Sequence, residues 1–381
     1  MCHTMGAHAP SRYFHNMRQD LVPTAVSLPR LSAEDGVFSR SPRRTSGTFT
    51  HPWPAPPLSG PAEVFRWKFL QKNPLGPLKR SRTPWIPTVG SGRDAWSTVR
   101  SDLRVQWLGH ASFLVEISET TILVDPVFGA AGPGVFRAAP PPVLPDALPA
   151  IDIILLSHGH YDHLDRRSLR AVRKRNPEVV VLVPSGQKKS IPGPREPVVE
   201  LSWFESVALR GVECTLTPAQ HWHLRTPWDR NRALWGGWMM RGAPRSDGHR
   251  PSVYHSGDTG WFDGFRVIRA ILGAPDVAIL PLGAYEPRWF MGGQHMPPED
   301  SLQAFTDLEA RHFVGMHWGT FDLSDEPIDH GPRDLLPLQL DARAIPPERV
   351  HVLSHGGVLG VSHDGRLDDA VGRHPAGAPT R

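Results

Sequence analysis

A cluster of histidines and one aspartate at residues 158–163 is the feature that most constrains how this chain can fold. The cluster reads His158-Gly159-His160-Tyr161-Asp162-His163. It follows Ile151 to Leu155, a largely apolar segment that is typical of a buried strand. After it, Leu169 and Val172 lie three apart among the basic residues of Arg166 to Arg175, which predicts an amphipathic helix. The cluster therefore lies on a loop between a strand and a helix.

The residue types of this loop suit a metal, because imidazole nitrogens and carboxylates are ligands that zinc accepts. His158 and His160 are two apart and can point the same way from an extended loop. Asp162 and His163 begin the next turn and face a different point, which favours two metal positions over one. A chance histidine-rich surface loop is the alternative, since the chain holds 20 histidines in 381 residues. Ligands from elsewhere in the chain decide between the two interpretations.

Three later strands each end just before a further ligand. The predicted strands Val212–Leu216, Ser252–His255 and Phe313–Met316 are followed by His221, Asp258 and His317. If these strands run the same way in two packed sheets, their ligands gather along one edge of the fold. We assign His158, His160 and His221 to one metal and Asp162, His163 and His317 to the other, with Asp258 between them. Two metals that share a carboxylate lie about 3.5–4 Å apart.

Composition limits the class of protein. Hydrophobic residues make up 39% of the chain and charged residues 21%, as in ordinary globular proteins. Two cysteines exclude a disulfide framework, and no apolar run predicts a membrane span or a secretory signal. We therefore expect a cytoplasmic protein, at most peripheral to the inner face of a membrane. No nucleic-acid module is evident, and the oligomeric state is open, a homodimer included.

We predict four regions. Residues 1–46 form a flexible arm, residues 47–102 a Pro- and Trp-rich extension that packs on the core, residues 103–360 the catalytic domain, and residues 361–381 a flexible tail. The catalytic domain begins with an antiparallel meander that ends at Asp125-Pro126. Residues 1–104 hold 15 Lys and Arg against 6 Asp and Glu. This excess indicates either a solvated arm or attraction to an anionic surface such as phospholipid headgroups.

The ligand motifs resemble the five-part signature of the metallo-β-lactamase fold. They are Gly109-His110-Ala111-Ser112, Asp125-Pro126, the 158–163 cluster, His221, Asp258 and His317. The resemblance covers about residues 103–360. It implies an α/β fold, a four-layer αββα sandwich, with two zinc ions at its edge, which iron or manganese could replace.

A narrower set of motifs resembles the N-acylphosphatidylethanolamine-hydrolysing phospholipase D family. It includes Gln220-His221-Trp222, Gly257-Asp258-Thr259-Gly260, Pro281 to Met291, Gln294-His295 and His317-Trp318-Gly319-Thr320-Phe321. The resemblance implies zinc-dependent cleavage of a phospholipid phosphodiester, with Asp162, Asp258 and His295 as the catalytic side chains. Our hypothesis is that a hydroxide between the metals attacks phosphorus while the metals stabilise the phosphoryl oxygens.

Other residues are candidates for supporting roles. Asp125 could orient a ligating imidazole, or it could be only an Asp-Pro turn residue. His110 and His355 could act behind the ligands, and Gln294 could contact the substrate. Tyr285 belongs to the aromatic stretch up to Met291, which could form a pocket wall or simply core.

Two other functions compete with the phospholipase D hypothesis. A lactonase resembling the ascorbate-6-phosphate lactonases would act on a small soluble substrate at the same site. A di-iron redox enzyme is disfavoured, because di-iron relatives carry Glu at the position of His160.

Overall fold

One long sheet runs through the molecule. The computed structural model describes residues 21–27, 35–38, 42–57, 59–194, 197–362 and 364–375. The strand order is β1-β10-β11-β12-β13-β14-β15-β16-β4-β5-β6-β7-β8-β9, with β17 paired to β16. The strands of this sheet are β1 (Thr24–Ala25), β4 (Leu103–Gly109), β5 (Ser112–Ile117), β6 (Thr120–Val124), β7 (Ile153–Leu155), β8 (Val180–Pro184), β9 (Val198–Leu201), β10 (Glu205–Leu209), β11 (Val212–Thr217), β12 (Gly237–Gly242), β13 (Ser252–His255), β14 (Val277–Pro281), β15 (His312–Met316), β16 (Val350–Val361) and β17 (Leu367–Pro375). A separate hairpin pairs β2 (Arg43–Thr45) with β3 (Thr48–Thr50).

The helices are short and lie mostly between strands. They are α2 (Pro61–Phe65), α3 (Gly76–Ser81), α4 (Gly92–Thr98), α5 (Arg166–Arg175), α6 (Gly264–Leu272), α7 (Arg288–Met291), α8 (Pro298–Asp307) and α9 (Leu336–Arg343). Shorter turns of helix are η1 (Asp35–Val37), η2 (Arg66–Leu70), η3 (Lys188–Ser190), η4 (Gly331–Leu335) and η5 (Pro347–Arg349).

The sheet consists of two similar runs of strands that meet at β16. In each run, β4–β9 and β10–β15, the first strands pair antiparallel and the last ones parallel. The long strand β16 is parallel to β15 and antiparallel to β4, so it joins the two runs. Parallel strands within a run end at the same edge, which is where the candidate ligands follow them.

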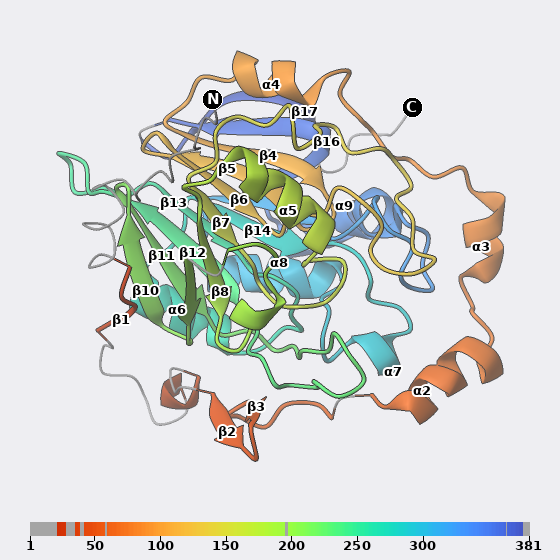
Figure 1. Cartoon of the computed structure of the whole chain (residues 1–381). Coiled ribbons are helices and arrows are strands. Elements are labelled where there is room, and N and C mark those ends of the chain that lie inside the picture. The colour runs from red at the N-terminus through yellow and green to blue at the C-terminus, as the bar shows by residue number, and fades with distance from the viewer. Residues whose placement is uncertain are drawn as a thin grey trace, which may run out of the picture.

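The two runs pack face to face, and helices cover their outer faces. Side chains alternate along each strand, so Leu114 and Ile154 face a core shared with α4 and α5, while Phe113 and Leu155 face the other run. The indole Nε1 of Trp238, in β12, donates across the interface to the carbonyl of Leu156 at 3.0 Å. In Figure 1, α4 and α5 lie on one side of the strands, and α6 and α8 on the other. The predicted four-layer αββα sandwich is confirmed.

The predicted elements around the histidine cluster match the structure closely. Helix α5 spans Arg166–Arg175 as expected, and the Asp165 carboxylate caps it by accepting from Arg167 N and Ser168 N. The three strands predicted to precede His221, Asp258 and His317 are β11, β13 and β15. Their ends lie within one residue of the predicted limits, because buried apolar runs bounded by Gly and Pro are clear strand signals.

The Pro- and Trp-rich segment 47–102 attaches to the core through tryptophans. Trp53 stacks on Trp203 and Phe262, at ring centroid distances of 5.3 and 5.2 Å. Farther along, Trp85 stacks on Trp318 at 5.6 Å. In Figure 1 this segment runs along the outside of the molecule from β3 through α2 and α3 to α4. The domain limits themselves stay a prediction.

Both predicted flexible ends contain ordered parts. The tail prediction is wrong for Leu367–Pro375, which forms β17 and pairs with β16. Its charged residues conceal the strand, since main-chain pairing with a long neighbour supplies the stability that an apolar pattern would normally signal. In the arm, β1 pairs with β10 and η1 and part of the hairpin β2–β3 are formed, while residues 1–20 lie outside the described residues.

No helix among the described residues has the length and apolar character needed to cross a bilayer.

His51 provides a test of how the extension is held. Its ring packs against Trp53 and Trp235, and burial lowers its pKa to about 4. As pH falls below about 6.5, the unfolded chain takes up a proton that the native state does not yet accept. Between pH 7 and pH 5 we expect the parent to lose about 2 kcal/mol more unfolding free energy than His51→Phe. Urea unfolding at both pH values measures this difference, and equal losses would contradict it.

Candidate metal centre

Four segments bring the predicted ligands together. The loop from Leu156 to Asp165, between β7 and α5, carries the histidine cluster. His221 follows β11, Asp258 follows β13 and His317 follows β15, all at the carboxyl ends of their strands. The structure places the seven predicted ligands in two adjoining groups, whose nitrogen and oxygen atoms lie within 4.8 Å of one another in each group.

The first group contains His158, His160, His221 and Asp258. His160 Nδ1 lies 2.9 Å from His158 Nε2 and 3.2 Å from His221 Nε2. Asp258 Oδ2 lies 3.8 Å from both His158 Nε2 and His221 Nε2. Ligand atoms of a tetrahedral zinc with bonds of about 2.0 Å stand about 3.3 Å apart. The spacing of these four atoms fits that ion.

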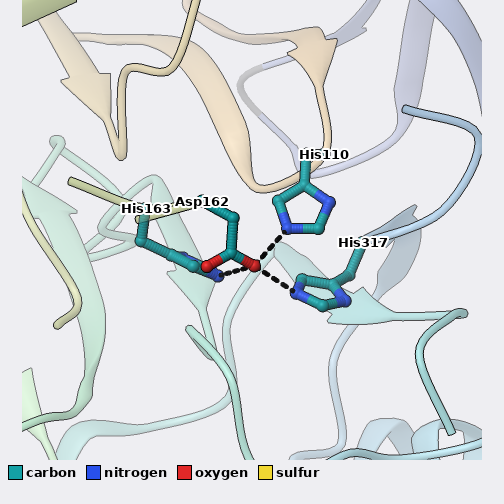
Figure 2. A group of neighbouring side chains, drawn as sticks. All are labelled: His110, Asp162, His163 and His317. Carbon is teal, nitrogen blue, oxygen red and sulfur yellow. Dashed lines mark hydrogen bonds and ion pairs between the residues drawn. The ribbon is translucent and has the colours of Figure 1, made fainter. Parts of the chain in front are cut away.

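The second group contains Asp162, His163 and His317, and His110 joins it (Figure 2). Asp162 Oδ2 lies 3.7 Å from the Nε2 atoms of both His163 and His317. It also lies 2.9 Å from His110 Nε2. The predicted set is thus present, with one further imidazole in contact with its carboxylate.

Asp258 lies between the two groups, as predicted. Its Oδ1 is 3.0 Å from His317 Nε2, and its Oδ2 is 3.1 Å from His163 Nε2. The side chain of Asp258 is 2% exposed, so both oxygens face imidazoles rather than water. One carboxylate therefore reaches both candidate metal positions.

Hydrogen bonds on the outer side of three of the five imidazoles leave their inner nitrogens free to ligate. His163 Nδ1 donates to Asp125 Oδ2 at 2.8 Å. His158 Nδ1 donates to Ser157 Oγ at 2.9 Å, and His221 Nδ1 donates to the carbonyl of Gln294 at 3.2 Å. Each of these bonds fixes the tautomer in which Nε2 carries a lone pair toward the group. The donor set therefore fits a metal as well as its spacing does.

Burial and charge also favour a cation here. Burial, with neighbouring imidazoles adding to it, lowers the pKa of His158 and His221 well below the usual value. Burial acts against His317 too, but the nearby Asp258 and Asp162 carboxylates raise its pKa to about 9. The second group thus holds negative charge that a proton or a metal ion must balance.

Three residues at the centre have strained backbone conformations. His110, Asp125 and His317 all have left-handed backbone conformations, with φ of 55°, 41° and 62°. Such conformations are uncommon for residues other than glycine and cost of order 1–3 kcal/mol each, and they cluster at functional sites. The local turns that aim these three side chains at the centre are therefore held by their surroundings.

A mostly apolar cavity of about 620 Å³ opens onto the centre. Its polar floor includes His160, Asp162, Asp258, His295 and His317. Its wall contains the apolar residues Ala131, Trp222, Leu224, Pro227, Ala284, Phe290, Met291 and Leu323. Ala131 belongs to the long loop after β6, and Phe290 and Met291 belong to α7.

His295, predicted to be catalytic, and three predicted supporting residues take different positions. Gln294 and His295 line the cavity, and His295 Nδ1 lies 3.9 Å from Asp258 Oδ2. The structure does not bring Tyr285 to the cavity: the residue is 1% exposed, and its hydroxyl contacts His330 Nδ1 at 2.7 Å. The stretch from Tyr285 to Met291 divides between the two alternatives: Tyr285, a candidate for substrate contact, belongs to the core instead, whereas Phe290 and Met291 line the cavity. His355 is fully buried behind the centre and contacts Thr320.

Comparison with known proteins agrees with this geometry. The model of the β-lactamase superfamily domain matches residues 120–318. The N-acyl-phosphatidylethanolamine-hydrolyzing phospholipase D 1 of Caenorhabditis elegans is 37% identical over 261 residues, which cover 64% of this chain and 71% of that protein. The chain belongs to the β-lactamase superfamily, in the branch of this phospholipase.

Other members of the superfamily support the coarser assignment. A metal-dependent hydrolase of Methanopyrus kandleri is 30% identical over 247 residues, covering 64% of this chain and 96% of that protein. The solved structure of a possible metal-dependent hydrolase from Veillonella parvula shares the fold, with a TM-score of 0.52 and 18% identity over 68% of this chain and 100% of that one. The chain of the present sequence is therefore a metal-dependent hydrolase of this superfamily.

Sequence reasoning missed two of the residues that support the ligands from behind, Ser157 and Thr320. Ser157 donates its hydroxyl to Asp125 Oδ2 at 2.6 Å and accepts from His158. Its position between a strand and the first ligand was a usable signal. Thr320 contacts the backbone of His110 across 210 positions of sequence, so no local pattern marks it.

Replacing Asp125 tests whether it orients His163 or merely forms a turn. In Asp125→Asn the charged acceptor for His163 Nδ1 is lost, and we expect zinc affinity to fall about 10- to 100-fold. Asp152→Asn is the matched control. Asp152 precedes β7, at the end of the strand away from the metal centre, and its carboxylate accepts from Thr121 N. Chelator competition measures both variants. Unchanged zinc binding in Asp125→Asn would leave only the turn role.

Proposed function

We propose that this protein is a zinc-dependent phosphodiester hydrolase of the phospholipase D type that acts on N-acylphosphatidylethanolamine-like phospholipids. The observation that carries the proposal is a pair of ligand groups sharing Asp258 at the floor of an apolar cavity. Paired metals suit in-line displacement at phosphorus, and an apolar wall suits acyl chains. The similarity to the C. elegans phospholipase supports this choice among the hydrolases of the superfamily.

Two zinc ions bound at these groups would supply water of lowered pKa and would polarise the phosphoryl oxygens. The residues of the chain hold this arrangement in place. Asp258 spans the two groups, and Asp162, in contact with His110, completes the second. Asp258 is 2% exposed and Asp162 is 16% exposed, so at least the shared carboxylate is screened little by water, which strengthens its interaction with cations.

His295 is the side chain best placed to meet the substrate. It lines the cavity beside Asp258, and its Nδ1 has no hydrogen-bond partner among the described residues. Burial lowers its pKa to about 4, so the ring is neutral at pH 7. A neutral imidazole can donate one hydrogen bond to a phosphoryl or leaving-group oxygen, which gives His295 a role in binding the reacting group.

The first experiment compares substrates on the zinc-loaded and the chelator-treated protein. We expect zinc-dependent release of an N-acylethanolamine from the N-acylated phospholipid, and no turnover of a cyclic nucleotide or a lactone. Turnover of the lactone without cleavage of the lipid would overturn the proposal in favour of a lactonase.

Replacing Asp258 tests its place between the metals. Asp258→Asn removes the charge that serves both groups, so we expect at least about a 10²-fold loss of lipid hydrolysis and fewer zinc ions per chain. Asp263→Asn, an exposed change five residues later, is the control and should behave as the parent. Full activity with two zinc ions in Asp258→Asn would contradict the assigned role.

An exposed apolar surface beside the cavity supports contact with a lipid bilayer. We call Phe65, Phe69 and Leu70, of α2 and η2, the apolar ridge; they are 54%, 73% and 70% exposed. Trp67 between them packs on Phe290 of the cavity wall at 4.7 Å. The stretch from Arg66 to Lys72 adds three basic residues and no acidic one. Exposed aromatic and aliphatic side chains flanked by cations are typical of peripheral membrane contacts.

Charge placed on the ridge should separate membrane binding from chemistry. In the double variant Phe69→Glu, Leu70→Glu we expect co-sedimentation with anionic phospholipid vesicles to fall at least about tenfold, since two anions enter the interface. Hydrolysis of the substrate in detergent micelles should change less than about twofold. Leu338→Glu, at another exposed leucine on α9, is the control. Parent-like vesicle binding by the double variant would refute a docking role for the ridge.

A further inference from the structure

The backbone of His110 is fixed from three sides. Its N–H donates to Thr320 Oγ1 at 2.6 Å. Its carbonyl accepts from Trp107 Nε1 at 2.8 Å and from the N–H of His317 at 3.1 Å. These bonds hold His110 in its left-handed conformation, which any non-glycine residue adopts only under constraint. They also tie the end of β4 to the end of β15, the strand that delivers His317.

Because its backbone is fixed, the imidazole of His110 can orient the Asp162 carboxylate through a hydrogen bond. The ring is buried and lies against the Asp162 carboxylate. His110 Nε2 lies 2.9 Å from Asp162 Oδ2, and its Nδ1 has no partner among the described residues. The tautomer that donates from Nε2 satisfies both facts. One lone pair of Asp162 Oδ2 is thereby committed to His110, which fixes how the carboxylate faces the second group (Figure 2).

Thr320 uses the whole hydrogen-bonding capacity of its hydroxyl. The residue is fully buried, and Oγ1 accepts from His110 N and from His355 Nε2, the latter at 2.9 Å. The same hydroxyl donates to the carbonyl of Trp318 at 3.2 Å. A hydroxyl has one donor and two acceptor sites, so no capacity is left over. Three partners at defined positions therefore hold the Thr320 hydroxyl, which a threonine that only filled space would not need.

His355 connects this series to the amino-terminal extension. Its ring stacks on Trp107 at 4.3 Å, and its backbone N–H donates to the carbonyl of Pro87 at 2.8 Å. Its own carbonyl accepts from Val89 N at 3.0 Å. The segment around Thr88 therefore lies against β16 as a short parallel bridge.

We propose that Thr320 is a positioning residue for the metal centre: the hydrogen-bonded series from His355 through Thr320 and His110 sets the Asp162 carboxylate toward the second group. This inference rests on the proposed function in one respect, namely that Asp162 ligates zinc. Loss of the Thr320 hydroxyl leaves the buried N–H of His110 without an acceptor and frees the turn that aims its ring.

The test compares Thr320→Val, which keeps the shape, with Thr320→Ser, which keeps the hydroxyl. In Thr320→Val we expect the affinity for one of the two zinc ions to fall about tenfold and the other to stay unchanged, the usual effect of removing a support behind a ligand. Thr320→Ser should bind both ions within about twofold of the parent. Chelator competition gives the affinities, and the visible spectrum of the Co²⁺-substituted protein reports the altered ligand field at the second group.

Two further variants keep the test decisive. Thr215→Val is the matched control, because Thr215 is also fully buried and its Oγ1 makes no hydrogen bond to the described residues. His355→Phe keeps the ring on Trp107 but removes the donor to Thr320, and should weaken the same zinc ion at least threefold. It serves in place of Thr320→Val if that variant does not fold.

The outcomes distinguish this inference from the proposed function. If the parent binds two zinc ions and both Thr320→Val and His355→Phe bind them with parent affinity, the positioning role is overturned. Equal losses in Thr320→Val and Thr320→Ser at equal melting temperature overturn it as well, because the hydroxyl then does not matter. If the parent itself binds no zinc, the metal centre fails instead. None of these readouts depends on which substrate the enzyme cleaves.

Discussion

The candidate metal centre brings together imidazole nitrogens and carboxylate oxygens whose lone pairs repel one another unless a cation lies between them. The Nε2 atoms of His158 and His221 lie 2.9 and 3.2 Å from His160 Nδ1, and a single proton on that nitrogen cannot be donated fully to both. Two carboxylates, Asp162 and Asp258, stand among the imidazoles, and Asp258 is withdrawn from bulk water. Such a group is costly to bury unless positive charge offsets it. The strained turns and the hydrogen bonds behind the imidazoles are explained as the means of holding ligands in that arrangement.

Rigid parts of the fold hold the ligands of the centre, and more variable parts line the cavity. Strand ends and buried hydrogen bonds hold the ligands, whereas loops and the short helix α7 form the wall of the cavity. Chemistry that tolerates little displacement thus rests on the sheet, and substrate selection rests on segments that can differ among relatives. The amino-terminal extension serves both parts, since it carries the exposed ridge near α7 and also contacts His355 behind the centre.

The meeting of the candidate ligands could be predicted from the sequence because each segment that carries them follows a buried apolar strand. The four-layer fold was implied by the resemblance of these motifs to the metallo-β-lactamase signature. The supporting contacts could not be predicted, because Thr320 and His110 meet only in three dimensions. The choice between pocket wall and core for Tyr285 could not be made from the sequence, since one turn of the chain decides whether an aromatic residue faces a cavity or a neighbouring loop. Strand β17 was missed because its charged residues hide pairing that depends on the main chain.

Strand β16 gives the centre a property that a site within a single sheet would lack. Each ligand group draws side chains from both runs of strands, and β16 is the element that joins these runs. A bound metal ion would therefore link the two runs of strands across their interface. Its retention would report whether the two runs are correctly packed against each other. Loss of the metal and separation of the two runs would then be linked events, so a misassembled copy would also lack its metal.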